Sequence, residues 1–232
     1  MRRLRKSGES GCMPKVRVFL VWLACIFGLT KIGWAVSKVF YEDGVIQDGD
    51  DYTIVQVLND AVVNMTGGLV TDALGTEDTS TLNIFGGYAA RVGATEWSFI
   101  NLYDGMETGY IEILSSSTLN MYGGLTGVVE IGTTNPVHLR GGAITDYLIA
   151  RSTVDIYGYD FSYDLYGGSY GGGRLSGFWT NGIPLSIDLY AIYNPPYGGT
   201  IDTWSHVVLH TIPEPSTLIL LTFAVVFMRS HR

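Results

Sequence analysis

Cysteine is almost absent from this chain, and basic residues are scarce once its two ends are set aside. The 232 residues include two cysteines, Cys12 and Cys25, so residues 36–212 contain none. A domain built from that stretch must rely on its core and its hydrogen bonds instead of disulfides. The same stretch holds five Lys or Arg and 20 Asp or Glu, a formal net charge of −15. This acidity argues against nucleic acid and anionic membranes as partners.

An apolar run near the N-terminus, residues 18–29, follows a basic segment and precedes small residues. A basic region, an apolar region and a small-residue site together make a secretory signal peptide. We therefore expect residues 1–35 to be removed on export. Translation starts at Met1 or at Met13, and the Met13 start would give a signal of more usual length. An acylated lipoprotein site at Cys25 is the alternative, although its preceding residues fit such a site poorly.

A second apolar run, residues 218–228, lies between a Pro-Glu-Pro motif and a basic end. The two prolines lack backbone donors and favour extended neighbours, so a processing enzyme would meet an open strand. The run has about half the length that spans a bilayer, yet it can enter one with the basic end on the cytoplasmic side. The motif is Pro213, Glu214 and Pro215, and the basic end includes Arg229 and Arg232.

The order of motif, apolar run and basic end closely resembles the PEP-CTERM sorting signal of bacterial surface proteins. This resemblance covers residues 211–232. It implies an exosortase-like processing enzyme as partner, transient association of the tail with the inner membrane, and delivery to the cell surface or an extracellular matrix. The alternative is an ordinary buried C-terminal strand or helix, which the N-terminal signal disfavours.

Six near-copies of one pattern follow one another through the middle of the chain. In each, apolar and polar or aromatic residues alternate before a glycine pair or its remnant, and the copies start 17–19 residues apart. The alternation is typical of a strand with one buried face, and the glycines predict a sharp turn at the same point of every copy. The copies begin at Val63, Leu82, Ile100, Leu119, Val137 and Val154.

A repeat of this length is too short for a strand-helix-strand unit of about 30 residues, but it fits short strands wound into one solenoid turn. We predict an all-β, single-domain parallel β-helix over residues 36–160, with an N-terminal cap near 36–44. One glycine pair per turn, without a six-residue period, favours the right-handed form over the left-handed one. A β-propeller would need about 40 residues per blade. Residues 161–210 depart from the period and are predicted to form a β-rich cap.

Stacking the copies would align equivalent side chains in columns about 4.8 Å apart. We expect outward asparagines to hydrogen-bond along the stack, continued by His138 and Asp155, beside an aromatic column interrupted by Arg140. The rings would either stack on one another or meet the sugar rings of an extracellular polysaccharide. This expected ligand-contact ladder consists of Asn83, Phe85, Asn101, Tyr103, Asn120 and Tyr122.

The repeats, with Ser-Thr pairs before several of them, also resemble β-helical repeats of surface proteins that carry this type of tail. No catalytic triad and no His or Cys set with metal-ligand spacing is evident, and the histidines are expected on the surface or in the ladder. The acidic segment 42–51 offers oxygen ligands to calcium but lacks the pattern of an EF-hand, so we expect a solvated loop and no cofactor. The sequence thus predicts an exported structural or adhesive protein and no enzyme. A carbohydrate-binding or polysaccharide-cleaving β-helix is the alternative.

Replacing the acidic residue of the motif, Glu214→Ala, is expected to alter processing of the tail without altering the fold, because the motif lies outside the repeats. Immunoblotting of the chain, expressed beside an exosortase-like enzyme, would compare the lengths of the products. Ser216→Ala, just beyond the motif, is the matched control. Normal processing of Glu214→Ala would contradict the sorting assignment.

Overall fold

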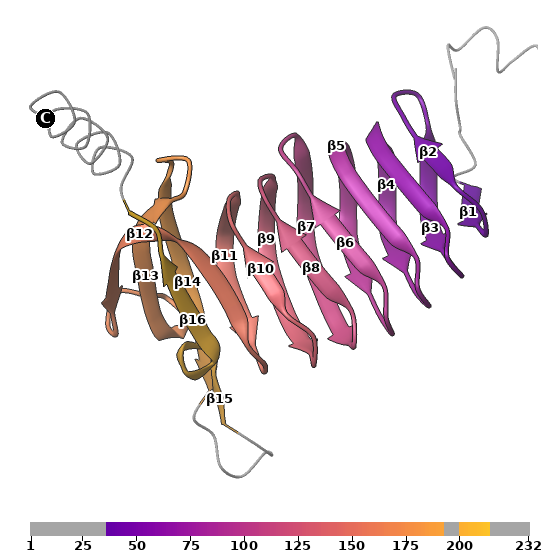
Figure 1. Cartoon of the computed structure of the whole chain (residues 1–232). Coiled ribbons are helices and arrows are strands. Elements are labelled where there is room, and N and C mark those ends of the chain that lie inside the picture. The colour runs from indigo at the N-terminus through magenta and orange to yellow at the C-terminus, as the bar shows by residue number, and fades with distance from the viewer. Residues whose placement is uncertain (1–35, 193–199, 214–232) are drawn as a thin grey trace, which may run out of the picture. The chain divides into compact units, whose positions relative to one another are not determined.

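Each turn of the chain contributes a short strand to one wall of a coil and a longer strand to the other (Figure 1). The computed structural model describes residues 36–192 and 200–213. The short strands form face 1: β2 (Gly44–Ile46), the starts of β4 (Val62–Thr76) and β5 (Thr81–Ala94), β6 (Phe99–Leu102), β8 (Thr118–Met121), β10 (Val137–Leu139), the start of β12 (Val154–Asp164) and β16 (Val207–Thr211). The longer strands form face 2: β1 (Val36–Phe40), β3 (Asp51–Val57), the ends of β4 and β5, β7 (Met106–Ser115), β9 (Leu125–Thr133), β11 (Ala143–Ala150) and β14 (Pro184–Ile192).

The predicted register of the repeats is confirmed. The first residues of the six copies are consecutive parallel partners across face 1, and so are the third residues. All twelve side chains are at most 1% exposed. Because alternate residues of a strand point to the same side, a period-2 pattern repeated in register fills one continuous core. The chain therefore forms the predicted parallel β-helix.

Two corners turn the chain within each coil. At the first corner, the second glycine of every pair has φ between 85° and 97°, in the left-handed region that glycine adopts without strain. In the third copy Asp104 replaces the first glycine of the pair, a position that does not have a positive φ. At the second corner, the left-handed position is taken by other residues, with φ of 59° to 64°. These residues are Asn59, Asp78, Glu96 and Ser115.

Buried serines secure the second corner. Ser80 and Ser98 are fully buried. The single hydroxyl hydrogen of each is within reach of two acceptors, a carbonyl of its own corner and a carbonyl of the preceding coil. The same holds for Ser117. This accounts for the Ser80-Thr81 and Ser117-Thr118 pairs, whose buried serine hydroxyls are satisfied. Ser152 of the third pair differs, because its buried hydroxyl has no hydrogen-bond partner among the described residues.

The N-terminal strands continue the coil. β2 pairs in parallel with β4 on face 1, and β1 pairs in parallel with β3 on face 2. The region near 36–44 thus supplies an additional rung to each face.

Within the described residues, no helix has the length and apolarity required to cross a membrane.

The end of the coil is closed by antiparallel strands, which matches the predicted β-rich cap. β12 runs on to pair with β13 (Gly171–Trp179), β13 pairs with β14, and β14 returns beside β11. Trp179 is 1% exposed, and its Nε1–H donates to the Gly142 carbonyl at 2.9 Å. Tyr163 stacks on Trp204 with ring centroids 3.9 Å apart. These rings cover core that the last coil would otherwise expose.

The last strand, predicted as part of the cap, also belongs to the coil. β15 (Ile201–Asp202) and the 3-10 helix η2 (Thr203–His206) lead into β16, which pairs in parallel with β12. Val207 lies beside Val154, and Leu209 lies beside Ile156. Face 1 therefore extends beyond the six copies at both ends, by β2 and by β16.

Leu119→Asp is expected to prevent folding, because it places a carboxylate in a fully buried column between Ile100 and Val137. Leu119→Met, which keeps the volume, should cost less than about 1.5 kcal/mol of unfolding free energy. Circular dichroism and thermal melting would compare the two variants. A normal β spectrum and melting temperature for Leu119→Asp would contradict the register.

Candidate functional site

The outward asparagines of face 1 form a continuous ladder. Asn83 Nδ2 donates to Asn64 Oδ1 at 2.9 Å, Asn101 Nδ2 to Asn83 Oδ1 at 2.8 Å, and Asn120 Nδ2 to Asn101 Oδ1 at 2.9 Å. The expected hydrogen bonding along the stack is therefore present. Since each central amide uses one donor and its carbonyl oxygen within the ladder, it retains limited capacity for a ligand.

The aromatic column beside the asparagines is also stacked on itself. The ring centroids of Phe85 and Tyr103 lie 4.6 Å apart, and those of Tyr103 and Tyr122 lie 5.2 Å apart, with interplanar angles of 5° and 10°. Both faces of the Tyr103 ring are thus covered by other rings. Such pairs contribute about 0.5 to 1.5 kcal/mol each beyond their burial. The exposed parts of the central rings are edges, whereas sugar rings stack on aromatic faces.

The sequence predicts that Arg140 interrupts the aromatic column. In the structure its guanidinium instead lies between the rings on either side and joins them. Its guanidinium carbon lies 5.5 Å from the Tyr122 ring centroid and 4.7 Å from that of Tyr157. Its Nη1 also donates to the Tyr122 hydroxyl at 3.2 Å. A guanidinium between two rings is favourable on both sides. Tyr157 then stacks on His210, with centroids 4.5 Å apart.

The hydrogen-bonded ladder ends at Asn120, and the next two positions of its column are His138 and Asp155, whose carboxylate lies between two imidazoles. Asp155 Oδ2 lies 3.2 Å from His138 Nδ1, and Asp155 Oδ1 lies 2.7 Å from His210 Nε2. Burial lowers the pKa of His138, and the positive charges of Arg140 and His210 lower it further, outweighing the opposite effect of Asp155. The cluster fastens β16 to β12. Within the described residues, no group of three or more His, Cys, Asp or Glu side chains is arranged to hold a metal ion.

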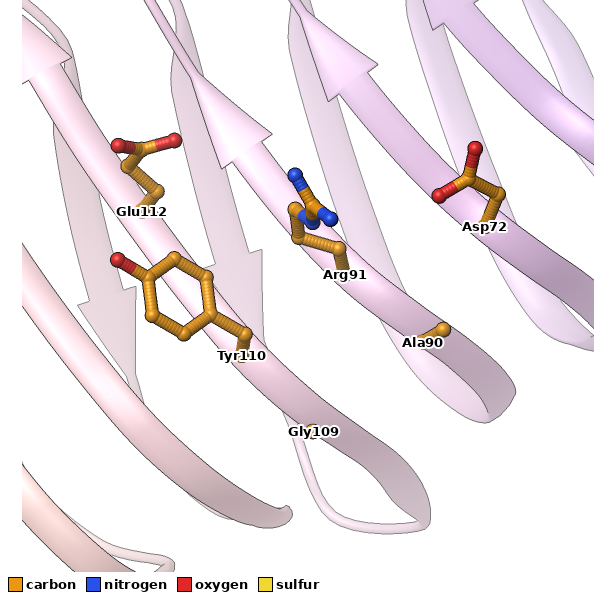
Figure 2. Close-up of a pocket in the computed structure, with 6 residues that line it drawn as sticks. All are labelled: Asp72, Ala90, Arg91, Gly109, Tyr110 and Glu112. Atoms are coloured by element: carbon orange, nitrogen blue, oxygen red, sulfur yellow. The ribbon is translucent and has the colours of Figure 1, made fainter.

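Face 2 carries a groove that the sequence pattern did not reveal. A hollow of about 520 Å³ is lined by residues of β4, β5 and β7 (Figure 2). A second hollow of about 220 Å³ shares Gly109 with it and extends over β9 and β11. The first hollow is lined by Asp72, Ala90, Arg91, Gly109, Tyr110 and Glu112.

The charges of the first hollow are held apart on neighbouring strands. The side chains of Asp72, Arg91 and Glu112 make no hydrogen bond or ion pair with any residue that the structure describes. The Tyr110 hydroxyl donates to Glu130, which also pairs with Arg151. Burial and this hydrogen bond raise the pKa of Tyr110. Burial opposes the charge of Glu130, but the hydrogen bonds from Tyr110 and Arg151 outweigh it and lower its pKa.

In the acidic segment 42–51, predicted as a solvated loop, residues 44–46 form β2, and two carboxylates accept hydrogen bonds from backbone amides, one within the segment and one in the next coil. Asp50 Oδ2 accepts a hydrogen bond from the Gln47 amide at 2.9 Å, and Asp43 Oδ1 accepts one from the Val62 amide at 2.8 Å. The signal segment 1–35 and most of the tail, with Glu214, Pro215, Arg229 and Arg232, lie outside the described residues, while Pro213 lies two residues beyond β16.

Comparisons of the chain with protein-family models, with curated proteins and with solved structures found no match.

His138→Asn, which introduces the residue found at the equivalent position of the four preceding copies, is expected to reduce the pH dependence of the unfolding free energy. Because the folded chain lowers the pKa of His138 below the ordinary value of about 6.5, the unfolded chain takes up this proton first as the pH falls. The stabilising contribution is thus complete above about pH 6.5 and is lost below it. The melting temperature should fall less for His138→Asn than for the unaltered chain between about pH 7 and about pH 5. His206→Asn is the control, and equal slopes for all three proteins would contradict the assignment.

Proposed function

We propose that the chain is an exported protein of a bacterial cell surface or extracellular matrix, with a structural and adhesive role and no catalytic one. The observation that carries the proposal is the self-satisfied ladder of face 1. Its amides and rings bind one another from rung to rung instead of converging on a point where a reacting atom could lie. Side chains used in this way give rigidity along the stack.

The route to the surface rests on the two ends of the chain. The signal segment 1–35 supports export, and the tail 211–232 supports sorting by an exosortase-like enzyme. The net charge of −15 over residues 36–212 suits a hydrated matrix, since like-charged chains stay dispersed. Absence of cysteine from this stretch makes the stability of the coil independent of the redox state outside the cell.

A carbohydrate-binding or polysaccharide-cleaving β-helix is the second candidate, favoured by the groove on face 2. Its carboxylates, Asp72 and Glu112, come from β4 and β7, with β5 between them. Glu112 is level with Gly75 of β4, so its backbone lies two rungs across the sheet and three residues along it from that of Asp72, roughly 14 Å in all. Retaining glycosidases hold their carboxyl groups about 5 to 5.5 Å apart and inverting ones about 6.5 to 9.5 Å. The separation therefore supports binding more than cleavage.

Localisation tests the first proposal. Antibodies against the full-length chain should label intact cells or the matrix between them, and a chain without residues 1–35 should be detected only after lysis. The purified full-length chain, incubated with cell-surface polysaccharide, should release no reducing sugar. Retention of the unaltered chain inside the cell would exclude the surface role, and release of sugar that Glu112→Gln abolishes would establish the enzyme instead.

A further inference from the structure

We propose that the groove on face 2, and not the aromatic column of face 1, is the ligand-binding surface, and that its ligand is an extended neutral glycan. This inference deepens the adhesive role proposed above and rests on it. The groove is defined by the two adjoining hollows over β4, β5, β7, β9 and β11.

The floor of the groove is nearly bare backbone. Ala90, Gly109 and Gly127 follow one another on β5, β7 and β9, between residues that pair in register on either side. A Cβ on Gly127 would lie 2.6 Å from the Gly109 carbonyl oxygen, so this position cannot gain a side chain unless the backbone moves. Because Ala90 and Gly109 carry little or no side chain, a ligand can approach the main chain there, as it cannot on face 1, where the asparagines and rings project.

The rings beside this floor differ from those of face 1. Tyr88 is 39% exposed, and Tyr110 lines the larger hollow. Neither ring is stacked on another ring of the described residues. Their faces are thus free of the partners that occupy both sides of Tyr103. The Tyr88 ring is exposed and the Tyr110 ring is half-buried, and an exposed aromatic face suits the apolar face of a sugar ring.

Polar groups of both signs stand over the same floor, projecting from the same side of the sheet (Figure 2). The Arg91 guanidinium offers several N–H donors, and the carboxylates of Asp72 and Glu112 each offer two acceptor oxygens. A sugar with neighbouring hydroxyl groups can satisfy both kinds, since each hydroxyl donates and accepts. Glu107 lines the smaller hollow and adds another negative charge. The excess of carboxylates disfavours acidic glycans, so the expected ligand is neutral.

The direction of the groove fits a linear polymer. It crosses the strands and therefore follows the stack, where successive rungs lie about 4.8 Å apart. This spacing is close to the length of one pyranose unit in an extended chain. Each rung can thus meet one sugar in a similar way, and affinity should grow with the number of sugars until the five strands are covered.

Binding of soluble oligosaccharides to the full-length chain, held in a mild detergent and measured by calorimetry, tests the proposal. The probes are glucan, mannan and xylan oligosaccharides from disaccharide to octasaccharide, with polygalacturonate oligomers as the acidic comparison. At least one neutral series should bind, with affinity rising with length. Ala90→Leu, which fills the floor, and Arg91→Gln, which removes the cation, should each weaken binding at least tenfold.

Two controls separate this surface from the alternatives. Ala191→Leu makes the same substitution in the cap, and Tyr103→Ala opens the aromatic column; both should bind as the unaltered chain does, provided that melting shows them to be folded. Loss of binding in Tyr103→Ala with retention in Ala90→Leu would assign the ligand to face 1, overturning the groove while leaving the adhesive role intact. Preference for polygalacturonate would overturn the neutral class. Binding of no probe would overturn the groove proposal, and localisation would still decide the surface role independently.

Discussion

The coil depends on one constraint: its successive turns hydrogen-bond in parallel and largely in register, so that most residues of the repeats have their own equivalents as neighbours. A buried position then needs only one kind of side chain to build a column, and an outward position needs only a side chain that can pair with itself. Asparagine meets this requirement because its amide both donates and accepts. Flat aromatic rings meet it by stacking. In a mixed antiparallel sheet the same residues would face dissimilar partners and gain less.

The constraint also explains where the ladders change character. The asparagine column gives way to His138 and Asp155 near the end of the coil, where β16 arrives from distant sequence instead of from the next repeat. A rung with no covalent corner to the rung before it benefits from a stronger fastening. The Asp155 carboxylate supplies it by contacting an imidazole on each side. Thr203 adds to it from η2, accepting a hydrogen bond from the Ala150 amide at 3.1 Å and donating to the Tyr190 carbonyl at 2.7 Å.

Much of the coil could be predicted from sequence because its signals are local and repeated. The register followed from six aligned apolar pairs, and the first corner followed from glycines that alone tolerate its φ. β16 could not be placed in the same way, since Val207 begins a copy whose corner glycine is missing and whose separation from Val154 is far longer than one repeat. Its Val-Val-Leu-His pattern, aligned with Val-Asp-Ile-Tyr at Val154, was the available signal. The groove depends on which side chains are absent from a column, and Ala90, Gly109 and Gly127 share no apolar pattern that would have marked them.

The attachment of β16 has a mechanical consequence. The chain leaves the described coil directly after this strand, and the Ile212 amide still donates to the Gly158 carbonyl at 2.8 Å. Any tension on the chain beyond Pro213 must therefore enter the protein through a single rung. A pull along the strand would load all the hydrogen bonds between β16 and β12 together, whereas a pull away from the sheet would break them one after another. The direction of the pull thus decides whether β16 resists the force or is the first strand to detach from the coil.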